Sequence, residues 1–300
     1  KPGHIASLGR TGGFIFDFIK KEYLKVRRED LALVRSLALG IDKDAPEREI
    51  YQDAVLSTGW ASESDSNHDP LLETRIQSID RRYQWSLTQT HRELLPLVLM
   101  AHASRRYFDS GLGQHAAFPE TVVRRACLAG EEPKRILVIG DDDFLSVALQ
   151  ACGHSVTVLD IDPGLLQIAR RVTGERTPPI VHIEQDIRLP MEQSLFGYFD
   201  AFFVDPMSSE VFFHAALSRG LSALKPGGKG FVCVSEAGLD AFRRCQKHFG
   251  FQIDEHWSDF NHYYLPSLSP SPYCSDLMEI NLPPSVDLAI LRELAAMPID

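Results

Sequence analysis

The amino-acid sequence predicts an α/β protein built on a doubly wound parallel sheet, with a smaller module in front of it. After residue 120, short apolar runs alternate with amphipathic segments, the pattern of strands joined by crossover helices. Before residue 110, apolar side chains recur mainly at helical spacing. With 300 residues, 44% of them hydrophobic, the chain can fill one large core or two modest ones.

The first module, residues 1–112, is predicted to be a helical or winged-helix-like domain. Phe14, Phe18 and Ile19 recur at helical spacing. A polar, turn-rich stretch later interrupts the helices and would serve as a loop or a wing, so both kinds of module fit the pattern. The expected elements are helices over 14–19, 30–40, 46–55 and 70–109 and a loop over 61–69.

The second domain, residues 113–300, begins within the glycine-containing segment 110–115. Right-handed crossovers place the carboxyl ends of its parallel strands at one edge of the sheet, where ligands bind. The expected strands span 135–139, 155–160, 180–184, 201–205, 230–234, 251–256 and 276–280. Acidic residues gather at that edge, namely 141–143, Asp160 with Asp162, Asp186 and Asp205.

The first of these strands ends in Gly140 and three consecutive acids, Asp141, Asp142 and Asp143. Nucleotide-binding α/β folds usually place glycines here, because bare backbone lets a cofactor approach closely. Three adjacent carboxylates repel one another, so they need a cation, a proton or an amine nearby.

Two later acids are candidates for holding a nucleoside. Asp160 stands 20 residues after Gly140, where a nucleotide-binding sheet places the acid that binds ribose hydroxyls. The alternative is a helix cap, a role that Asp162 can fill instead. Asp186 follows the third strand and would accept from an adenine amino group, or it is an ordinary turn residue.

Asp205 and Pro206 end the fourth strand, where a carboxylate would face the reacting end of an adenosyl cofactor. Such a group can hold an amine nucleophile and remove its proton, because a protonated amine cannot attack. The alternative is again a helix cap. The cluster 259–264 combines carboxylate and aromatic side chains that suit a polyamine, although a packed loop would look the same.

Composition narrows the class of partner. The 41 acids against 31 bases give a net charge of −10, which disfavours nucleic acid and favours a cationic substrate. No apolar run reaches the roughly 18 residues of a membrane span, and five cysteines without a CxxC pair fit a reducing compartment. The histidines show no metal-ligand spacing. We therefore expect a cytoplasmic protein with no metal, membrane or nucleic-acid partner.

Several segments together resemble the branched-chain polyamine synthases, which are N4-bis(aminopropyl)spermidine synthases. They are the glycine and acids at 140–143 with Leu145-Ser146-Val147-Ala148, then 158–162, Asp205-Pro206, 217–220 and 259–261, preceded by 119–125. The resemblance implies a winged-helix-like domain followed by a Rossmann-like, class I adenosylmethionine-dependent transferase domain, commonly as a homodimer. It also implies aminopropyl transfer from decarboxylated S-adenosylmethionine to an amine, with release of methylthioadenosine.

The residues and the resemblance give these site predictions. The catalytic residues are Asp141, Asp142, Asp143 and Asp205; the cofactor-binding residues are Gly140, Asp160, Ile161, Asp186, Asp205 and Pro206. The substrate-binding residues are Asp141, Asp142, Gln114, Met207, Asp259, Asn261 and Tyr263. Two segments depart from the family pattern, around Gln114 and at Met207, and both lie where the family recognises its acceptor.

Two other functions fit the same sequence. An enzyme using ordinary S-adenosylmethionine would transfer a methyl or a 3-amino-3-carboxypropyl group, with Arg188 or Arg219 as the cation for the donor carboxylate. A ligand-sensing regulator would keep the fold and use its N-terminal module to bind a partner or DNA.

Overall fold

The computed structural model describes residues 4–8, 12–17, 22–27, 119–264, 273–283 and 286–299, and single positions between 94 and 117. Within these residues no helix combines the length and apolar character needed to cross a membrane. The helices expected over 30–40 and 46–55, the loop over 61–69 and most of the helix over 70–109 lie outside the described residues.

The main body is an eight-stranded sheet in the order β4-β10-β11-β9-β8-β5-β6-β7. Its strands are β4 (Ala116–Ala117), β5 (Arg135–Ile139), β6 (Ser155–Asp160), β7 (Val181–Glu184), β8 (Phe199–Val204), β9 (Leu224–Val234), β10 (Gln252–Tyr264) and β11 (Tyr273–Asn281). The helices are α5 (Pro119–Leu128), α6 (Leu145–Ala151), α7 (Pro163–Thr173), α8 (Glu210–Ala223), α9 (Leu239–Phe249) and α10 (Leu288–Ala295), with 3-10 turns η3 (Gln193–Leu195) and η4 (Glu236–Gly238). All seven expected strands are confirmed.

The directions of two strands correct the expectation of a purely parallel sheet, since the short β4 runs antiparallel to β10 and β11 runs antiparallel to both of its neighbours. Strands β5, β6, β7, β8 and β9 are parallel, but β11 runs antiparallel to both β9 and β10. Only residues 265–272 separate β10 from β11, and a parallel crossover needs a connection of about a dozen residues or more. Because β10 is again parallel to the main strands, its carboxyl end lies at the same edge as theirs.

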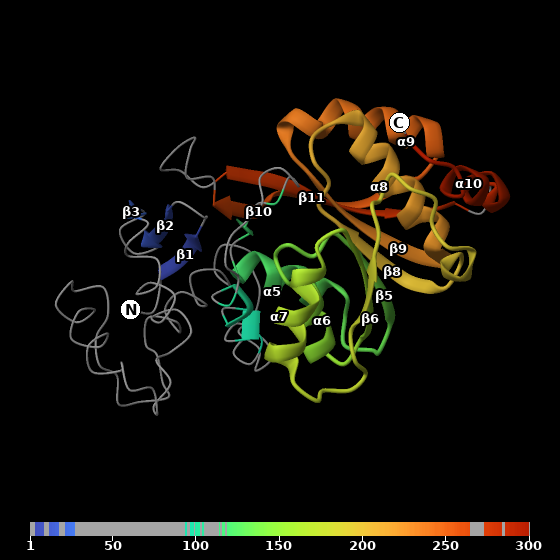
Figure 1. The fold of residues 1–300 in the computed structure, drawn as a ribbon. Helices are drawn as coiled ribbons and strands as arrows, with labels where there is room; N and C mark the ends of the chain where they lie inside the picture. The colour runs from blue at the N-terminus through green and yellow to red at the C-terminus, as the bar shows by residue number, and fades with distance from the viewer. Residues whose placement is uncertain are drawn as a thin grey trace.

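Helices cover both faces of the sheet (Figure 1), with α5, α6 and α7 on one face and α8, α9 and α10 on the other. Alternate side chains of β5 enter the two cores: Ile136 and Val138 one, Leu137 and Ile139 the other. This alternation explains why the strand is apolar from Ile136 to Ile139. The layered arrangement leaves the carboxyl ends of the parallel strands uncovered by the helix packing.

The N-terminal residues differ from expectation. Phe14 lies in a strand, because β1 (His4–Leu8), β2 (Gly12–Asp17) and β3 (Glu22–Arg27) form an antiparallel sheet. The backbone register pairs Phe16 with Tyr23, so strand pairing replaces the helix that the spacing of the aromatic residues indicated. The rest of the expected first helix, with Phe18 and Ile19, lies outside the described residues.

Part of the segment before residue 113 packs with the main sheet. Leu94, Val98 and Ala101 are helical and buried in the same core as Val147 of α6. Packing around the sheet therefore starts before the expected boundary, and the division into 1–112 and 113–300 stays a prediction.

Candidate active site

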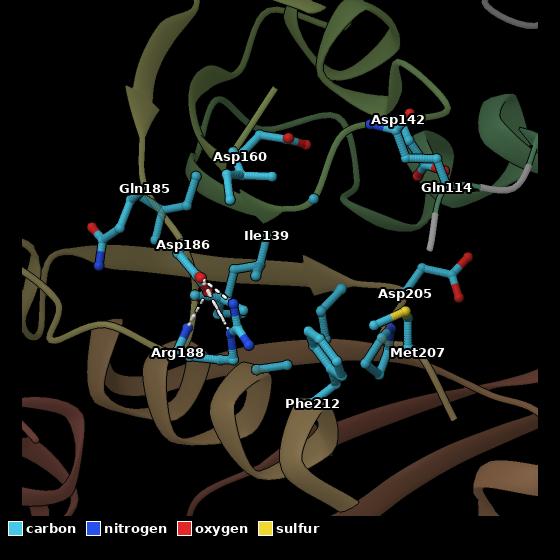
Figure 2. A pocket seen from close by; sticks show the side chains of 17 residues that line it. Gln114, Ile139, Asp142, Asp160, Gln185, Asp186, Arg188, Asp205, Met207 and Phe212 are labelled. Carbon is cyan, nitrogen blue, oxygen red and sulfur yellow. Dashed lines mark hydrogen bonds and ion pairs between the residues drawn. The ribbon is translucent and has the colours of Figure 1, made fainter. Parts of the chain in front are cut away.

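A cavity of about 270 Å³ opens at the carboxyl ends of β5, β6, β7 and β8. Figure 2 shows Asp186 and Arg188 toward one end and Asp142, Gln114, Asp205 and Met207 toward the other. The expected site residues in its lining are Gly140, Asp142, Asp160, Ile161, Asp186, Asp205, Pro206, Gln114 and Met207. The expected residues outside that lining are Asp141, Asp143, Asp259, Asn261 and Tyr263.

The loop after β5, which carries the three acids, has an unusual backbone conformation. Gly140 has φ 74° and Phe144 has φ 62°, so the chain enters the left-handed region twice within five residues. Glycine adopts that region freely, whereas phenylalanine does so at a cost that its fully buried ring must offset. The amide of Phe144 donates to the carbonyl of Asp141 at 3.1 Å and closes the turn.

Asp141 points into the protein and stabilises the start of α6. Its carboxylate accepts from the Ser146 amide at 2.9 Å and also from the Ser146 hydroxyl. Burial raises the pKa of Asp141 well above its ordinary value, and the nearby carboxylates of Asp143 and Asp160 add to that rise. These bonds make Asp141 a capping group for the helix rather than a wall of the cavity.

Asp143 is also buried, at 4% exposure, and it pairs with a base. Arg125 Nη1 donates to Asp143 Oδ2 at 2.6 Å, and the Leu145 amide donates to Oδ1 at 3.2 Å. The ring of His102 donates from Nε2 to the carbonyl oxygen of Asp143 at 2.8 Å. Of the three consecutive acids, Asp142 alone lines the large cavity.

Asp205 lies across the cavity mouth at the end of β8, and its side chain is 28% exposed. Its Oδ2 accepts from Arg125 Nη2 at 2.8 Å and from the Tyr263 hydroxyl at 2.7 Å. A carboxylate held by two donors on one oxygen keeps the lone pairs of the other oxygen for a ligand.

Arg125 was not expected as a site residue. Besides Asp143 and Asp205 it donates to Asn261 Oδ1 and to the Tyr263 hydroxyl, each at 2.8 Å. Burial lowers its pKa, but the surrounding acidic groups, including those two carboxylates, raise it well above the ordinary value. The available signal was an arginine with apolar residues, Val122 and Leu128, three positions away on the same helix, because a buried arginine needs carboxylate partners.

The opposite end of the cavity carries the residues expected to hold a nucleoside. Asp160 accepts from the amides of Asp141 and Asp162, both at 2.8 Å. Burial raises the pKa of Asp160, and the two amide bonds oppose that rise. Asp162 caps α7 by accepting from the Gly164 amide at 2.9 Å, which confirms the separate capping role. It also accepts from Gln114 Nε2 at 3.2 Å.

Asp186 and Arg188 form an ion pair at the edge of the cavity, with Arg188 Nη2 2.6 Å from Asp186 Oδ2. Hydrogen bonding from Arg188 lowers the pKa of Asp186. Arg219 lies elsewhere: it is fully buried and donates to backbone carbonyls, including those of Ile187 and Leu294. Burial lowers its pKa to about 10. Arg219 therefore ties the loop after β7 to α10 and is absent from the cavity lining.

The residues of the cluster 259–264, at the end of β10, lie in two different environments. Asp259 is exposed, has φ 50° within an irregularity of the strand pairing, and donates its amide to Asp276 Oδ1 at 3.0 Å. Asn261 and Tyr263 instead reach Arg125, and Ser275 lies between them. These two residues support the walls of the site indirectly, through Arg125.

The cavity lining has a strongly negative balance. It contains four carboxylates, Asp142, Asp160, Asp186 and Asp205, against one base, Arg188, which already pairs with Asp186. Among the described residues, no group of three or more His, Cys, Asp or Glu is arranged to hold a metal ion. The excess charge favours a cationic organic ligand over an anionic one.

Comparison with known proteins gives matches in sequence and in fold. An N(4)-bis(aminopropyl)spermidine synthase of Thermococcus kodakarensis is 33% identical over 159 residues, covering 48% of this chain and 45% of that protein. The chain spans less than half the length of the curated relatives it matches.

Solved structures share the fold. The branched-chain polyamine synthase from Thermus thermophilus, in complex with N4-aminopropylspermidine and 5'-methylthioadenosine, superimposes with a TM-score of 0.62 at 22% identity, covering 92% of each chain. A putative RNA methyltransferase from Pyrococcus horikoshii superimposes with a TM-score of 0.50 at 12% identity, covering 65% of this chain and 98% of that one. The main sheet with the helices that cover it is thus Rossmann-like, as expected.

The family model for the branched-chain polyamine synthase A C-terminal domain matches residues 100–270, which are 171 of the 300 residues. That segment contains β5 to β8 and every acid of the cavity lining. The chain therefore belongs to the branched-chain polyamine synthase A C-terminal domain family.

Proposed function

We propose that the protein is an aminopropyltransferase that moves an aminopropyl group from decarboxylated S-adenosylmethionine to an amine and releases methylthioadenosine. The observation that carries this proposal is that Asp142 and Asp205 line one end of a cavity whose other end holds Asp160 and Asp186. The family's synthases and the ligands named for the Thermus thermophilus structure support the same reaction.

The nucleoside part of the donor would lie along the apolar floor of the cavity. Asp160 has both oxygens on backbone amides, which fixes its orientation while leaving lone pairs for ribose hydroxyls. Asp186 would accept from the adenine amino group, and Ile161 and Phe212 would contact the base. Gly140 and Pro206 complete the wall near the sulfur.

The transfer itself needs a neutral amine placed in line with the carbon that leaves sulfur. A carboxylate, Asp205 or Asp142, would take the proton from the ammonium group and release it to solvent. The amine nitrogen then forms a bond to the carbon as the carbon–sulfur bond breaks, and the electron pair neutralises the sulfonium. Because the sulfonium is already an activated leaving group, positioning would provide much of the acceleration.

The charge of the lining favours the decarboxylated donor. An ordinary donor would bring a carboxylate to the end of the cavity that holds Asp142 and Asp205, where like charges repel. Arg188 is the only base in the lining among the described residues, and it pairs with Asp186 at the other end. The methyl and 3-amino-3-carboxypropyl reactions therefore have less support.

The test is incubation of the purified protein with each donor in turn and a panel of polyamines, amino acids and other amines. Methylthioadenosine with an aminopropyl increment on the amine would support the proposal. Adenosylhomocysteine, or methylthioadenosine from the undecarboxylated donor alone, would overturn it, as would ligand binding without turnover. Asp142→Asn should abolish most product, and Asp240→Asn, an exposed acid on α9, is the matched control.

The family resemblance also leads us to propose a cytoplasmic homodimer with a separate N-terminal domain. Light scattering would measure the mass of the particle in solution, and a monomer at assay concentrations would contradict the dimer. Limited proteolysis would test the boundary near residue 112: a single early cut there supports it, whereas cleavage confined to the region before Leu94 would move the boundary toward the N-terminus.

A further inference from the structure

Arg125, in the last turn of α5, connects that helix to three other segments of the fold: the loop after β5, the loop after β8, and β10. Its guanidinium is 2% exposed and donates to Asp143, Asp205, Asn261 and Tyr263. Nε donates to the Asn261 side-chain amide oxygen and Nη1 donates to Asp143. Nη2 donates both to Asp205 and to the Tyr263 hydroxyl. This use of the planar fork is specific to arginine, because lysine has one ammonium group to place.

Arg125 also forms ion pairs with two carboxylates, in addition to joining the elements of the fold. One cation lies between two carboxylates, at 2.6 Å from Asp143 and 2.8 Å from Asp205, so the three groups carry a net charge of −1. The other titratable groups near Asp205 are the Tyr263 hydroxyl, the buried Cys233 thiol and Asp142. Removing the guanidinium would leave the buried Asp143 and the partly exposed Asp205 without the cation that lies between them.

We propose, on the basis of the proposed function, that Arg125 is a positioning residue for amine transfer. It holds Asp205 by one oxygen, so that the other oxygen is presented to the amine. It also supplies the positive charge that lies between the carboxyl groups of Asp143 and Asp205. Asp143 thereby acts through Arg125, and the amine contacts Asp142 and Asp205.

If Arg125 had a purely structural role, its replacement would be expected to change stability alone. The residue also joins α5 to β10, so its loss would lower stability in either case. Only the positioning role connects Arg125 to the protonation of the acids. Two carboxylates without a cation share a proton more readily, so the acid limb of the pH profile should move to higher pH.

The matched pair of variants is Arg125→Lys and Arg124→Lys. Arg124 is the preceding residue of the same helix, is equally buried, and donates to the Thr121 hydroxyl at 3.2 Å and to the Phe260 carbonyl. Neither acceptor is an acid of the cavity, so replacing Arg124 should affect stability and leave the pH profile in place. Arg125→Met removes the charge, and the double variant with Asp143→Asn removes one carboxylate as well.

The measurement is kcat and KM of the full chain, across pH, with decarboxylated S-adenosylmethionine and spermidine as the probes. We expect Arg125→Met to lower kcat/KM for the amine on the order of a hundredfold, as for loss of a positioned general base. Its acid limb should move to higher pH, while KM for the donor stays unchanged. Adding Asp143→Asn to Arg125→Met should bring the acid limb back toward its position in the unmodified protein. The acid limb of Arg125→Lys should lie between those of the unmodified protein and Arg125→Met.

The inference is overturned if Arg125→Lys and Arg124→Lys have the same acid limb and the same kcat/KM. It is also overturned if adding Asp143→Asn to Arg125→Met does not reverse the shift of the acid limb. Calorimetry of methylthioadenosine binding shows whether each variant is folded at the cavity. If Arg125→Met does not fold, the two lysine variants decide the outcome. Absence of transfer by the unmodified protein would instead refute the proposed function.

Discussion

Asp142→Asn separates the acid that faces the cavity from its two neighbours. The change keeps the side-chain shape and removes one charge from a half-buried carboxylate in the cavity lining. A carboxylate and an ammonium about 4 Å apart attract by about 4 kcal/mol at an effective dielectric constant of about 20. The amide would keep a hydrogen bond worth about 1 kcal/mol. The remaining loss of about 3 kcal/mol corresponds to about a hundredfold in kcat/KM for the amine.

The assay is initial-rate kinetics with varied amine at saturating donor, followed by varied donor at saturating amine. We expect the loss in the parameters for the amine and an unchanged KM for the donor, because Asp160 and Asp186 are untouched. Asp141→Asn is the internal comparison: its carboxylate caps α6 outside the lining, so activity should fall less than about tenfold. Equal activity of Asp142→Asn and the unmodified protein, or a larger loss in Asp141→Asn, would refute the reasoning.

Three further outcomes are expected. The folded state raises the pKa of Asp141, so its contribution to stability is complete below the unfolded pKa and is lost as pH rises through the folded pKa. The urea midpoint should therefore fall with rising pH, and less steeply in Asp141→Asn; equal slopes would contradict this. A Cβ at Gly220 would lie 2.6 Å from the Phe202 ring, so Gly220→Ala should lower the free energy of unfolding by about 2 kcal/mol in urea titrations. Burial raises the pKa of Cys152 to about 11, so iodoacetamide should label it far more slowly than a model thiol, as read by peptide mass spectrometry.

The strands of the second domain could be predicted because each is a short apolar run between turn residues. The direction of β11 could not be predicted from its apolar pattern. It is antiparallel to β10 because the connection between them is too short for a crossover. The aromatic residue Phe14 fits both a helical and a strand pattern, and pairing with neighbouring strands decided between them.

The acids of the site could be placed at the correct edge of the sheet, but their directions could not be predicted. In the loop between Gly140 and Phe144, which both have left-handed backbone, Asp141 and Asp143 are buried in the protein and Asp142 lines the cavity. No sequence rule anticipates that conformation in a phenylalanine. Arg125 was missed because its partners lie in three separate segments, brought together only by the folded sheet.

The most direct test of the central claim is the mass balance of one reaction. Decarboxylated S-adenosylmethionine and spermidine are incubated with the purified protein, and both products are quantified by mass spectrometry. We expect methylthioadenosine and an amine enlarged by aminopropyl groups, with one nucleoside formed for each group added. Methylthioadenosine without a matching increment, a different increment, or no product from this donor would contradict aminopropyl transfer at the cavity between Asp142 and Asp205.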